Sequence, residues 1–215
     1  MSKKRLEEGD IFYVEQNGKY FFGKILLDVN NRILKKEEDN IAFKFFSGCY
    51  LVAIYKGIYD KPELITKEFI ISSAFTFKKY FYSKKYKIEW TFYDNETIDY
   101  KQLDFPECLQ SGNENITYFR NGELFLKTNL TYNQFDNEYY VTCSIQGYYS
   151  LIDAACHYQN RDDLMDMTPA YYLEKSDLRF APEKRIAIYK QIGEGMSQSY
   201  YEMALKYDLD LGRFY

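Results

Sequence analysis

The hydrophobic pattern of this 215-residue chain changes its period at Gly147, and this change limits the fold more than any other feature of the sequence. Before Gly147, apolar and aromatic residues gather in short stretches that end at Asn, Asp or Gly, which favour turns. After Gly147 they recur at helical spacing, as at Leu151, Ala154, Ala155 and Tyr158. Strands followed by helices predict an α+β fold.

Two Asn-Gly pairs mark hairpins in the first part of the chain, at Asn17-Gly18 and Asn121-Gly122. Asn-Gly is the strongest two-residue hairpin signal, because both residues tolerate a positive φ. The expected strand regions are residues 10–16, 20–27, 41–55, 65–77, 85–93, 117–127 and 139–145. Their number and spacing predict an antiparallel β-rich region over residues 1–146, arranged as a barrel or a sandwich-like fold.

The last part of the chain, residues 147–215, carries helix signals. Pro182 suits a first helical turn, and Gly193 suits a helix end. Ser199 and Glu202 have the spacing of a capping box. We therefore expect two domains, a β-rich one over 1–146 and a small helical segment over 147–215.

Composition excludes several classes of protein. With 46% hydrophobic and 28% charged residues the chain is globular rather than disordered. Its apolar runs are far shorter than the roughly 18 residues of a membrane helix, so we expect no membrane partner. The basic start at Met1 is followed by Glu7 and Glu8 instead of an apolar stretch, so we expect no secretory signal and a cytoplasmic protein. The four cysteines form no C-x-x-C pair, and we expect them to act as small buried apolar residues.

Catalytic chemistry has little support in the sequence, and we expect no enzyme. His157 is the single histidine, so a histidine-based catalytic or zinc site would have to use it. Its neighbour Cys156 would project about 100° away from it on a helix, which does not suit a nucleophile and its base. We also expect no cofactor and no metal ion.

Two stretches are candidates for binding. Residues 78–87 interleave five lysines with four aromatic residues, as in surfaces that stack bases and neutralise phosphate. A solvated strand and turn is the other interpretation, because lysines at strand ends discourage edge pairing and the pI is near 5.3. We therefore keep nucleic-acid binding through residues 78–87 only as an alternative function. We do not expect nucleic acid to be the main partner.

The other candidate is acidic. Residues 94–150 hold nine acidic and three basic side chains, a net charge of −6. Such a surface can steer association with a basic protein, and exposed tyrosines beside it would supply interface anchors. The alternative is a solvated loop. The candidate partner-binding residues are Asp94, Glu96, Asp99, Asp104 and Glu107.

The N-terminal hairpin has a recognisable sequence, Gly9-Asp10-Ile11-Phe12 followed after a turn by Tyr20-Phe21-Phe22-Gly23-Lys24-Ile25-Leu26. This pattern resembles the opening of the immunity protein 26 family. The resemblance implies a β-rich fold over residues 1–146 and protection of bacteria against toxins of polymorphic toxin systems. It does not extend into 147–215, and it transfers no functional residue position by position.

The expected function is therefore to bind a cognate bacterial toxin and block its active surface. A toxin nuclease with a basic active site would suit the acidic stretch. The alternatives are a nucleic-acid-binding module that uses residues 78–87, and an enzyme of unrecognised type with convergent carboxylates in a pocket.

Overall fold

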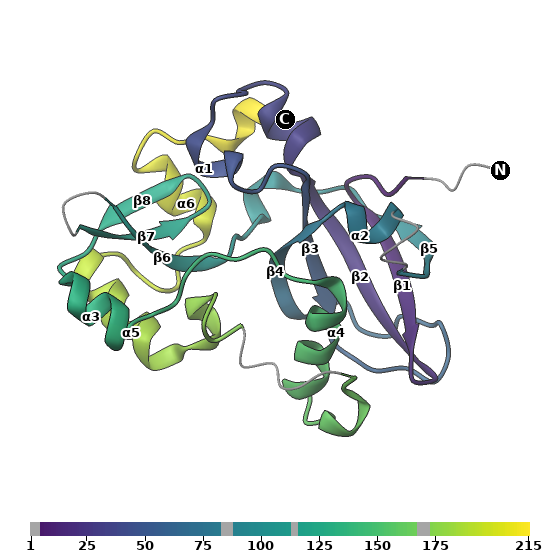
Figure 1. Ribbon diagram of the computed structural model, residues 1–215. Coiled ribbons are helices and arrows are strands. Elements are labelled where there is room, and N and C mark those ends of the chain that lie inside the picture. Colours follow the sequence, from purple (N-terminus) through teal and green to yellow (C-terminus); the bar gives the residue numbers. More distant parts are fainter. Residues whose placement is uncertain (1–4, 83–87, 113–115, 167–172) are drawn as a thin grey trace. The chain divides into compact units, whose positions relative to one another are not determined.

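The chain forms two compact units, each built from segments that are far apart in the sequence (Figure 1). The computed structural model describes residues 5–82, 88–112, 116–166 and 173–215. Unit 1 comprises Met1–Asn40, Lys44–Asp99 and Ile145–Ala170, and unit 2 comprises Ile41–Phe43, Tyr100–Ser144 and Tyr171–Tyr215. Each unit combines an antiparallel sheet with helices, so the predicted α+β class is confirmed. The predicted division after residue 146 is based on the change in the period of the hydrophobic pattern and not on packing contacts. It stays a prediction.

Five antiparallel strands form the sheet of unit 1, in the spatial order β4-β3-β2-β1-β5. The strands are β1 (Asp10–Gln16), β2 (Lys19–Asp28), β3 (Cys49–Tyr55), β4 (Phe69–Phe77) and β5 (Trp90–Asn95). Asn17 and Gly18 have φ values of 51° and 69°, so the predicted Asn-Gly turn joins β1 to β2. Within the described residues this sheet ends at β4 and β5, so it is open and not closed into a barrel.

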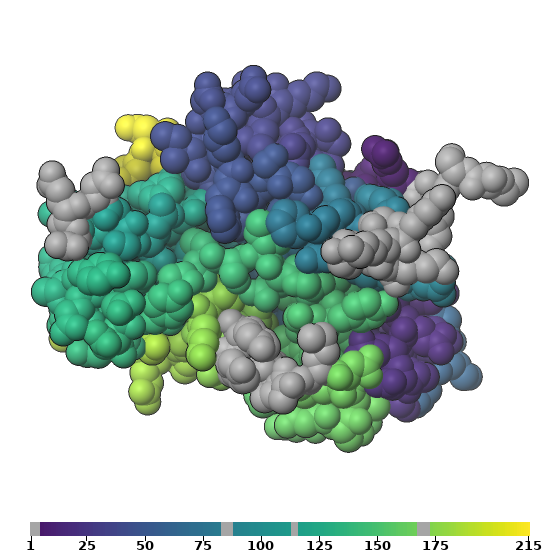
Figure 2. Space-filling model, in the orientation of Figure 1, coloured from purple at the N-terminus to yellow at the C-terminus, as the bar shows by residue number. Residues whose placement is uncertain are grey.

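Helix α4 (Tyr148–His157) packs on β3 and β4, and its outward side lies on the face drawn in Figure 2. The ring of Tyr148 lies 5.6 Å from that of Phe12 and 5.2 Å from that of Phe81, which belongs to α2 (Lys79–Tyr82). A Cβ on Gly23 would lie 2.9 Å from the Tyr148 hydroxyl and 2.7 Å from the Phe12 ring. Glycine at this position therefore makes room for the helix on the sheet.

Unit 2 contains a three-stranded antiparallel sheet in the order β6-β7-β8. Its elements are β6 (Glu107–Ser111), β7 (Thr117–Asn121), β8 (Leu124–Lys127), α3 (Tyr132–Asn137), α5 (Pro182–Ile192) and α6 (Tyr200–Leu205). Helix α5 ends at Gly193 with φ 74°, and Ser199 and Glu202 form the predicted capping box of α6. Local sequence signals therefore placed the turns and helix ends of this unit correctly.

The short helical elements complete the description. They are η1 (Val29–Leu34), α1 (Ile41–Lys44), η2 (Tyr100–Gln102), η4 (Asp162–Leu164), η5 (Leu178–Phe180) and η6 (Leu211–Phe214). Asp28 caps the first of these by accepting a hydrogen bond from the Asn31 amide at 3.0 Å.

Two strand predictions are wrong. Residues 41–44 form helix α1, and the strand in this region starts only at Cys49. Residues 139–145 form no strand, and Thr142 makes only an isolated parallel bridge to Leu109. Leu109 belongs to β6, a strand that the sequence did not predict. Its sequence Glu-Cys-Leu-Gln-Ser has too few apolar residues to indicate a strand, and it forms by pairing with β7.

Two of the four cysteines also differ from expectation, because Cys108 and Cys143 form a disulfide. Cys108 lies in β6 and Cys143 follows Thr142, so the bridge between Leu109 and Thr142 brings the two Cα atoms to 5.3 Å. This separation suits a disulfide. The expectation of buried, unbonded cysteines is confirmed for Cys49 and Cys156.

Candidate partner-binding surface

The face of the unit 1 sheet opposite α4 carries a group of partly exposed tyrosines. Alternation along β1 and β2 places Tyr13 and Tyr20 on this face, with ring centroids 5.6 Å apart. Tyr93 of β5 packs against the buried ring of Phe22, with centroids 4.9 Å apart, and remains 40% exposed. The buried ring beneath therefore fixes the orientation of an exposed one.

The loop between β3 and β4 extends this surface. The backbone of Tyr59 pairs with that of Tyr20 through hydrogen bonds of 2.9 and 3.2 Å, which holds the loop against the sheet. The Leu64 amide donates to the Tyr93 hydroxyl oxygen at 3.5 Å, and Ile65 next to it is 81% exposed. We call the set Tyr13, Tyr20, Leu64, Ile65 and Tyr93 the tyrosine face.

Charged side chains border the tyrosine face at β5. Asp94 follows Tyr93 and is exposed, and its carboxylate accepts a hydrogen bond from the Asn95 amide at 2.8 Å. Glu96 accepts hydrogen bonds from Lys67 and from Lys24, the latter at 3.0 Å. These two hydrogen bonds hold the pKa of Glu96 below its usual value. The border is therefore a mixed-charge rim in which Asp94 is the exposed acid.

The five predicted acidic residues fall into both units. Asp94, Glu96 and Asp99 belong to unit 1, and Asp94 and Asp99 are exposed. Asp104 and Glu107 belong to unit 2, where Glu107 is only 2% exposed. The structure brings Asp94 and Glu96 together at the end of β5, whereas Asp104 and Glu107 pair with arginines of unit 2.

Arginines of unit 2 hold those two acids, and the sequence did not indicate this. Glu107 accepts hydrogen bonds of 2.7 Å from Nε and from Nη2 of Arg185, and a third of 2.8 Å from the Tyr189 hydroxyl. Hydrogen bonding to Glu107 raises the pKa of Arg185, which keeps the guanidinium charged. Asp104 forms an ion pair with Nη1 of Arg179 at 2.5 Å. Each of these pairs joins residues more than 70 positions apart in the sequence, so no local pattern could predict them.

The lysine-rich stretch 78–87 is described only up to Tyr82, and residues 83–87 lie outside the described part. Lys78 forms an ion pair with Asp28, and the Lys79 ammonium lies 4.3 Å from the ring centroid of Phe77. Lys78 therefore contacts a distant part of the sequence, and Lys79 contacts the end of β4.

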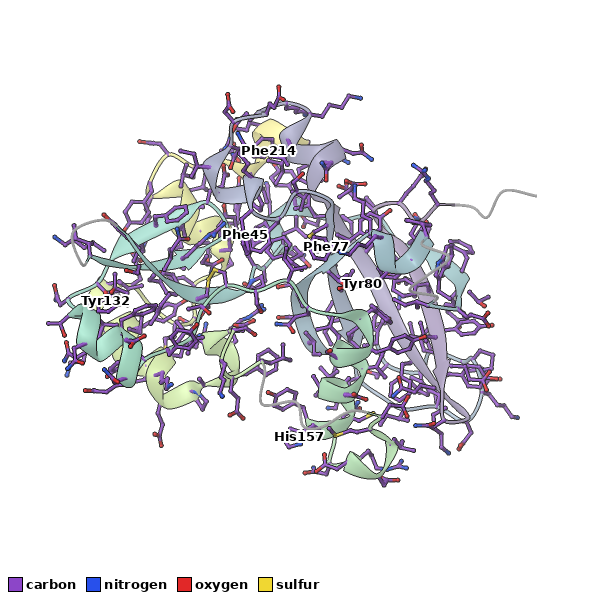
Figure 3. The ribbon with its side chains drawn as sticks, viewed as in Figure 1. Phe45, Phe77, Tyr80, Tyr132, His157 and Phe214 are labelled. Carbon is purple, nitrogen blue, oxygen red and sulfur yellow. A yellow bond between two sulfur atoms is a disulfide. The ribbon has the colours of Figure 1, made fainter. Side chains whose placement is uncertain are left out.

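Cys156 and His157 do not form a catalytic pair. Cys156 is buried, and burial raises the pKa of its thiol to about 12, so it is not a thiolate nucleophile. His157 lies at the end of α4, and its Nδ1 is 3.0 Å from a carboxylate oxygen of Asp162 (Figure 3). Among the described residues, no group of three or more His, Cys, Asp or Glu side chains is arranged to hold a metal ion. No helix in the described part is both long enough and apolar enough to span a bilayer.

Comparison with known families adds a finding to this geometry. Residues 7–107 match the model of the Immunity protein 26 family. The resemblance expected from the N-terminal hairpin is thereby confirmed, and its place in the chain is as predicted. No curated protein and no solved structure matches the chain. The matched span contains β1 to β5 and every residue of the tyrosine face, so the candidate surface lies within the part of the chain that is similar to this family.

Proposed function

We propose that this chain is an immunity protein of a bacterial polymorphic toxin system, which binds its cognate toxin in the cytoplasm and blocks the toxin's active surface. The observation that carries the proposal is the match of residues 7–107 to the Immunity protein 26 family together with the tyrosine face inside that span. The action is stoichiometric binding and involves no chemical step.

The tyrosine face has the properties of a protein-binding surface. Tyrosine is enriched at the points that dominate binding energy, because a rigid ring with a polar tip buries much area at small entropic cost. Tyr93 is held by Phe22 below it, and Tyr13 packs against both Tyr20 and Phe22. Such preorganised rings lose little freedom when a partner covers them.

The charges beside this face favour a basic partner. Asp94 and Asp99 are exposed, and Glu96 is half-buried between two lysines. A toxin that cleaves nucleic acid needs a basic surface to attract phosphate, and an acidic rim would steer and compete at that surface. We keep Asp94, Glu96 and Asp99 in the proposed binding set, and we assign Asp104 and Glu107 to the stability of unit 2.

The test uses the toxin domain encoded by the gene that adjoins the gene for this chain. The wild-type chain is expected to co-purify with that domain and to restore growth of cells that produce it. Tyr93→Ala should weaken binding by about 30-fold, as expected when a central aromatic anchor is lost. Tyr132→Ala is the matched control, since Tyr132 is 49% exposed in unit 2 and outside the family match.

Two outcomes would contradict the proposal in different ways. A wild-type chain that neither binds the adjacent toxin domain nor protects cells would reject the function. Suppose instead that Tyr93→Ala and the triple variant Asp94→Lys, Glu96→Lys, Asp99→Lys both bind the toxin domain as tightly as the wild type. The proposed function would then stand, but the tyrosine face and its acidic rim would not be the binding surface.

A further inference from the structure

The two cysteines of the unit 2 disulfide differ in their exposure to solvent. Cys108 in β6 is fully buried, whereas Cys143 is partly exposed. All four cysteines of the chain lie within the described residues, and the other two, Cys49 and Cys156, are buried free thiols. A thiol that approaches the folded chain from solvent therefore meets Cys143 before it meets any other cysteine.

The segment that carries Cys143 is attached to β6 by an isolated bridge and not by a continuous ladder. Thr142 makes this parallel bridge to Leu109, and the Leu109 amide donates to the Val141 carbonyl oxygen at 2.7 Å. The Thr142 amide donates to the Lys175 carbonyl oxygen at 2.9 Å. The other side of β6, in contrast, pairs with β7 over the whole strand. Short attachments open locally more easily than long ladders, so the Cys143 side of the disulfide is the side that can move.

The buried side of the disulfide has a cation on its face of the sheet. Arg120 lies opposite Cys108 in the register of β6 with β7, so the two side chains project from the same face. The Arg120 guanidinium donates to Oε1 of Gln110 at 3.1 Å and to the Ala42 carbonyl oxygen. Burial lowers the pKa of Arg120 to about 10, so the group is still charged at neutral pH. A nearby positive charge favours a thiolate, which makes Cys108 the better leaving group of the two.

The free cysteines do not compete for this disulfide. Burial raises the pKa of the Cys49 thiol and of the Cys156 thiol to about 12. The thiolate is the form that attacks a disulfide, so both groups are inert at neutral pH. The attacking sulfur must therefore come from another molecule.

We propose that the Cys108–Cys143 disulfide is a site of reversible exchange with a low-molecular-weight cellular thiol, which attaches to Cys143. The external thiolate attacks Sγ of Cys143, the bond between the two protein sulfurs breaks, and Cys108 leaves with the electron pair and takes up a proton from solvent. A second external thiol then attacks the mixed disulfide. Two external thiols are thereby oxidised to one disulfide, and the protein disulfide is reduced to two thiols.

Exchange at Cys143 links the closure of unit 2 to the thiol pool around the chain. We place the chain in the cytoplasm on the basis of its proposed function, and disulfides in that compartment are usually transient or redox-sensing. The exchange is measured on the isolated chain without the toxin domain. A failure of exchange and a failure of toxin binding are therefore separate results.

The test incubates the full-length oxidised chain with millimolar glutathione in the absence of denaturant, stops the reaction with acid and maps the modified cysteines by mass spectrometry. Glutathione is expected on Cys143 and not on Cys108. With oxidised glutathione as the probe, Cys108→Ala should be modified at Cys143 at least about tenfold faster than Cys143→Ala is modified at Cys108, because burial protects the latter. Cys156→Ala is the matched control and should react with reduced glutathione at the wild-type rate.

The same mapping in urea, where both sulfurs are accessible, should find glutathione on either cysteine and so shows that both adducts are detectable. A folded wild-type disulfide that glutathione leaves intact, or attachment to both cysteines alike in the folded chain, would overturn the proposal. The wild-type reaction alone decides between the two sulfurs, so a variant that does not fold leaves the test intact.

Hydrogen exchange measures the release of the segment. Reduction should speed exchange at the Leu109 amide by about tenfold and leave β2 of unit 1 unchanged, because only the first loses its covalent support. Equal exchange at Leu109 in the oxidised and reduced proteins would show that the disulfide does not control this attachment, and would overturn the link between exchange and the closure of unit 2.

Discussion

The two units use their charged residues in different ways. In unit 2, buried carboxylates pair with arginines, as Glu107 does with Arg185 and as Asp177 does with Arg179. In unit 1, carboxylates such as Asp60 and Glu96 pair mainly with lysines near the surface. A buried carboxylate needs several fixed donors, which a guanidinium provides better than an ammonium.

This difference shows why net charge along a sequence does not describe a surface. Residues 94–150 have a net charge of −6, yet the count includes acids such as Glu107 and Glu123 that unit 2 buries against arginines from outside that range. The exposed part of the same stretch begins with Asp94 beside the tyrosine face. Glu107 and Glu123 therefore stabilise unit 2, whereas the exposed Asp94 of unit 1 lies where it can take part in recognition.

The largest effect is expected for Glu107→Ala, which tests the comparison between the two units. This change leaves Arg185 and the Tyr189 hydroxyl without their shared acceptor, and we expect a loss of about 3–5 kcal/mol in the free energy of unfolding. Urea unfolding measures it. The matched control is Glu138→Ala, an exposed acid of the same unit, with an expected change within about 0.5 kcal/mol. Similar losses in the two variants would remove the distinction between buried and exposed acids.

The disulfide gives the next largest effect. It closes a loop with a sequence separation of 35 residues, and its loss should lower the free energy of unfolding by about 3 kcal/mol. We expect a reductant to lower the urea midpoint of the wild-type protein. The double variant Cys108→Ala, Cys143→Ala should start at a lower midpoint and not respond to the reductant. A wild-type midpoint that ignores the reductant would contradict a stabilising role in unit 2.

The third test concerns the surface of unit 1. Ile65→Asp changes a side chain that is 81% exposed, so the free energy of unfolding should shift by no more than about 0.5 kcal/mol. Binding of the adjacent toxin domain should weaken by about tenfold, because an apolar contact is replaced by a charge that the interface must desolvate. Calorimetry and urea unfolding of the same sample separate the two effects. A loss of stability with unchanged binding would show that Ile65 stabilises the fold and does not contact the toxin domain.

The smallest effect is expected at Glu96, and it depends on pH. Hydrogen bonds from Lys67 and Lys24 lower the pKa of Glu96 in the folded state. Its ion pairs therefore stabilise the protein above the unfolded-state pKa of about 4.3, and this contribution is lost as the pH falls through the lower folded-state pKa. Glu96→Gln should cost at most about 1 kcal/mol at neutral pH and should flatten the stability profile below pH of about 5. Identical acid profiles for the two proteins would show that these pairs contribute nothing.

Local sequence signals predicted the local parts of the fold. Asn17-Gly18, Gly193 and the pair Ser199 with Glu202 act through the conformations and hydrogen bonds of a few residues, and all lie where expected. Strand β6 and the bridge at Thr142 depend on partners elsewhere in the chain, and they were missed.

The candidate surface was predictable only in part. The sequence pointed to Asp94 and to exposed tyrosines beside it, and Tyr93 next to Asp94 is 40% exposed. It did not indicate that Tyr13 and Tyr20 share a sheet face or that the loop with Ile65 extends this surface, because that requires the register of β1 with β2 and the anchoring of the loop by Tyr59.

The position of α4 on the sheet has a practical consequence for protein production. The family match ends at residue 107, and Tyr148, Leu151 and Ile152, all buried in unit 1, lie beyond it. A fragment cut at the end of the match would keep the five strands but expose Phe12 and Phe81 to water. Uncovered apolar sheet faces promote self-association, so such a fragment would aggregate. The span recognisable by similarity is thus shorter than the set of segments that forms unit 1.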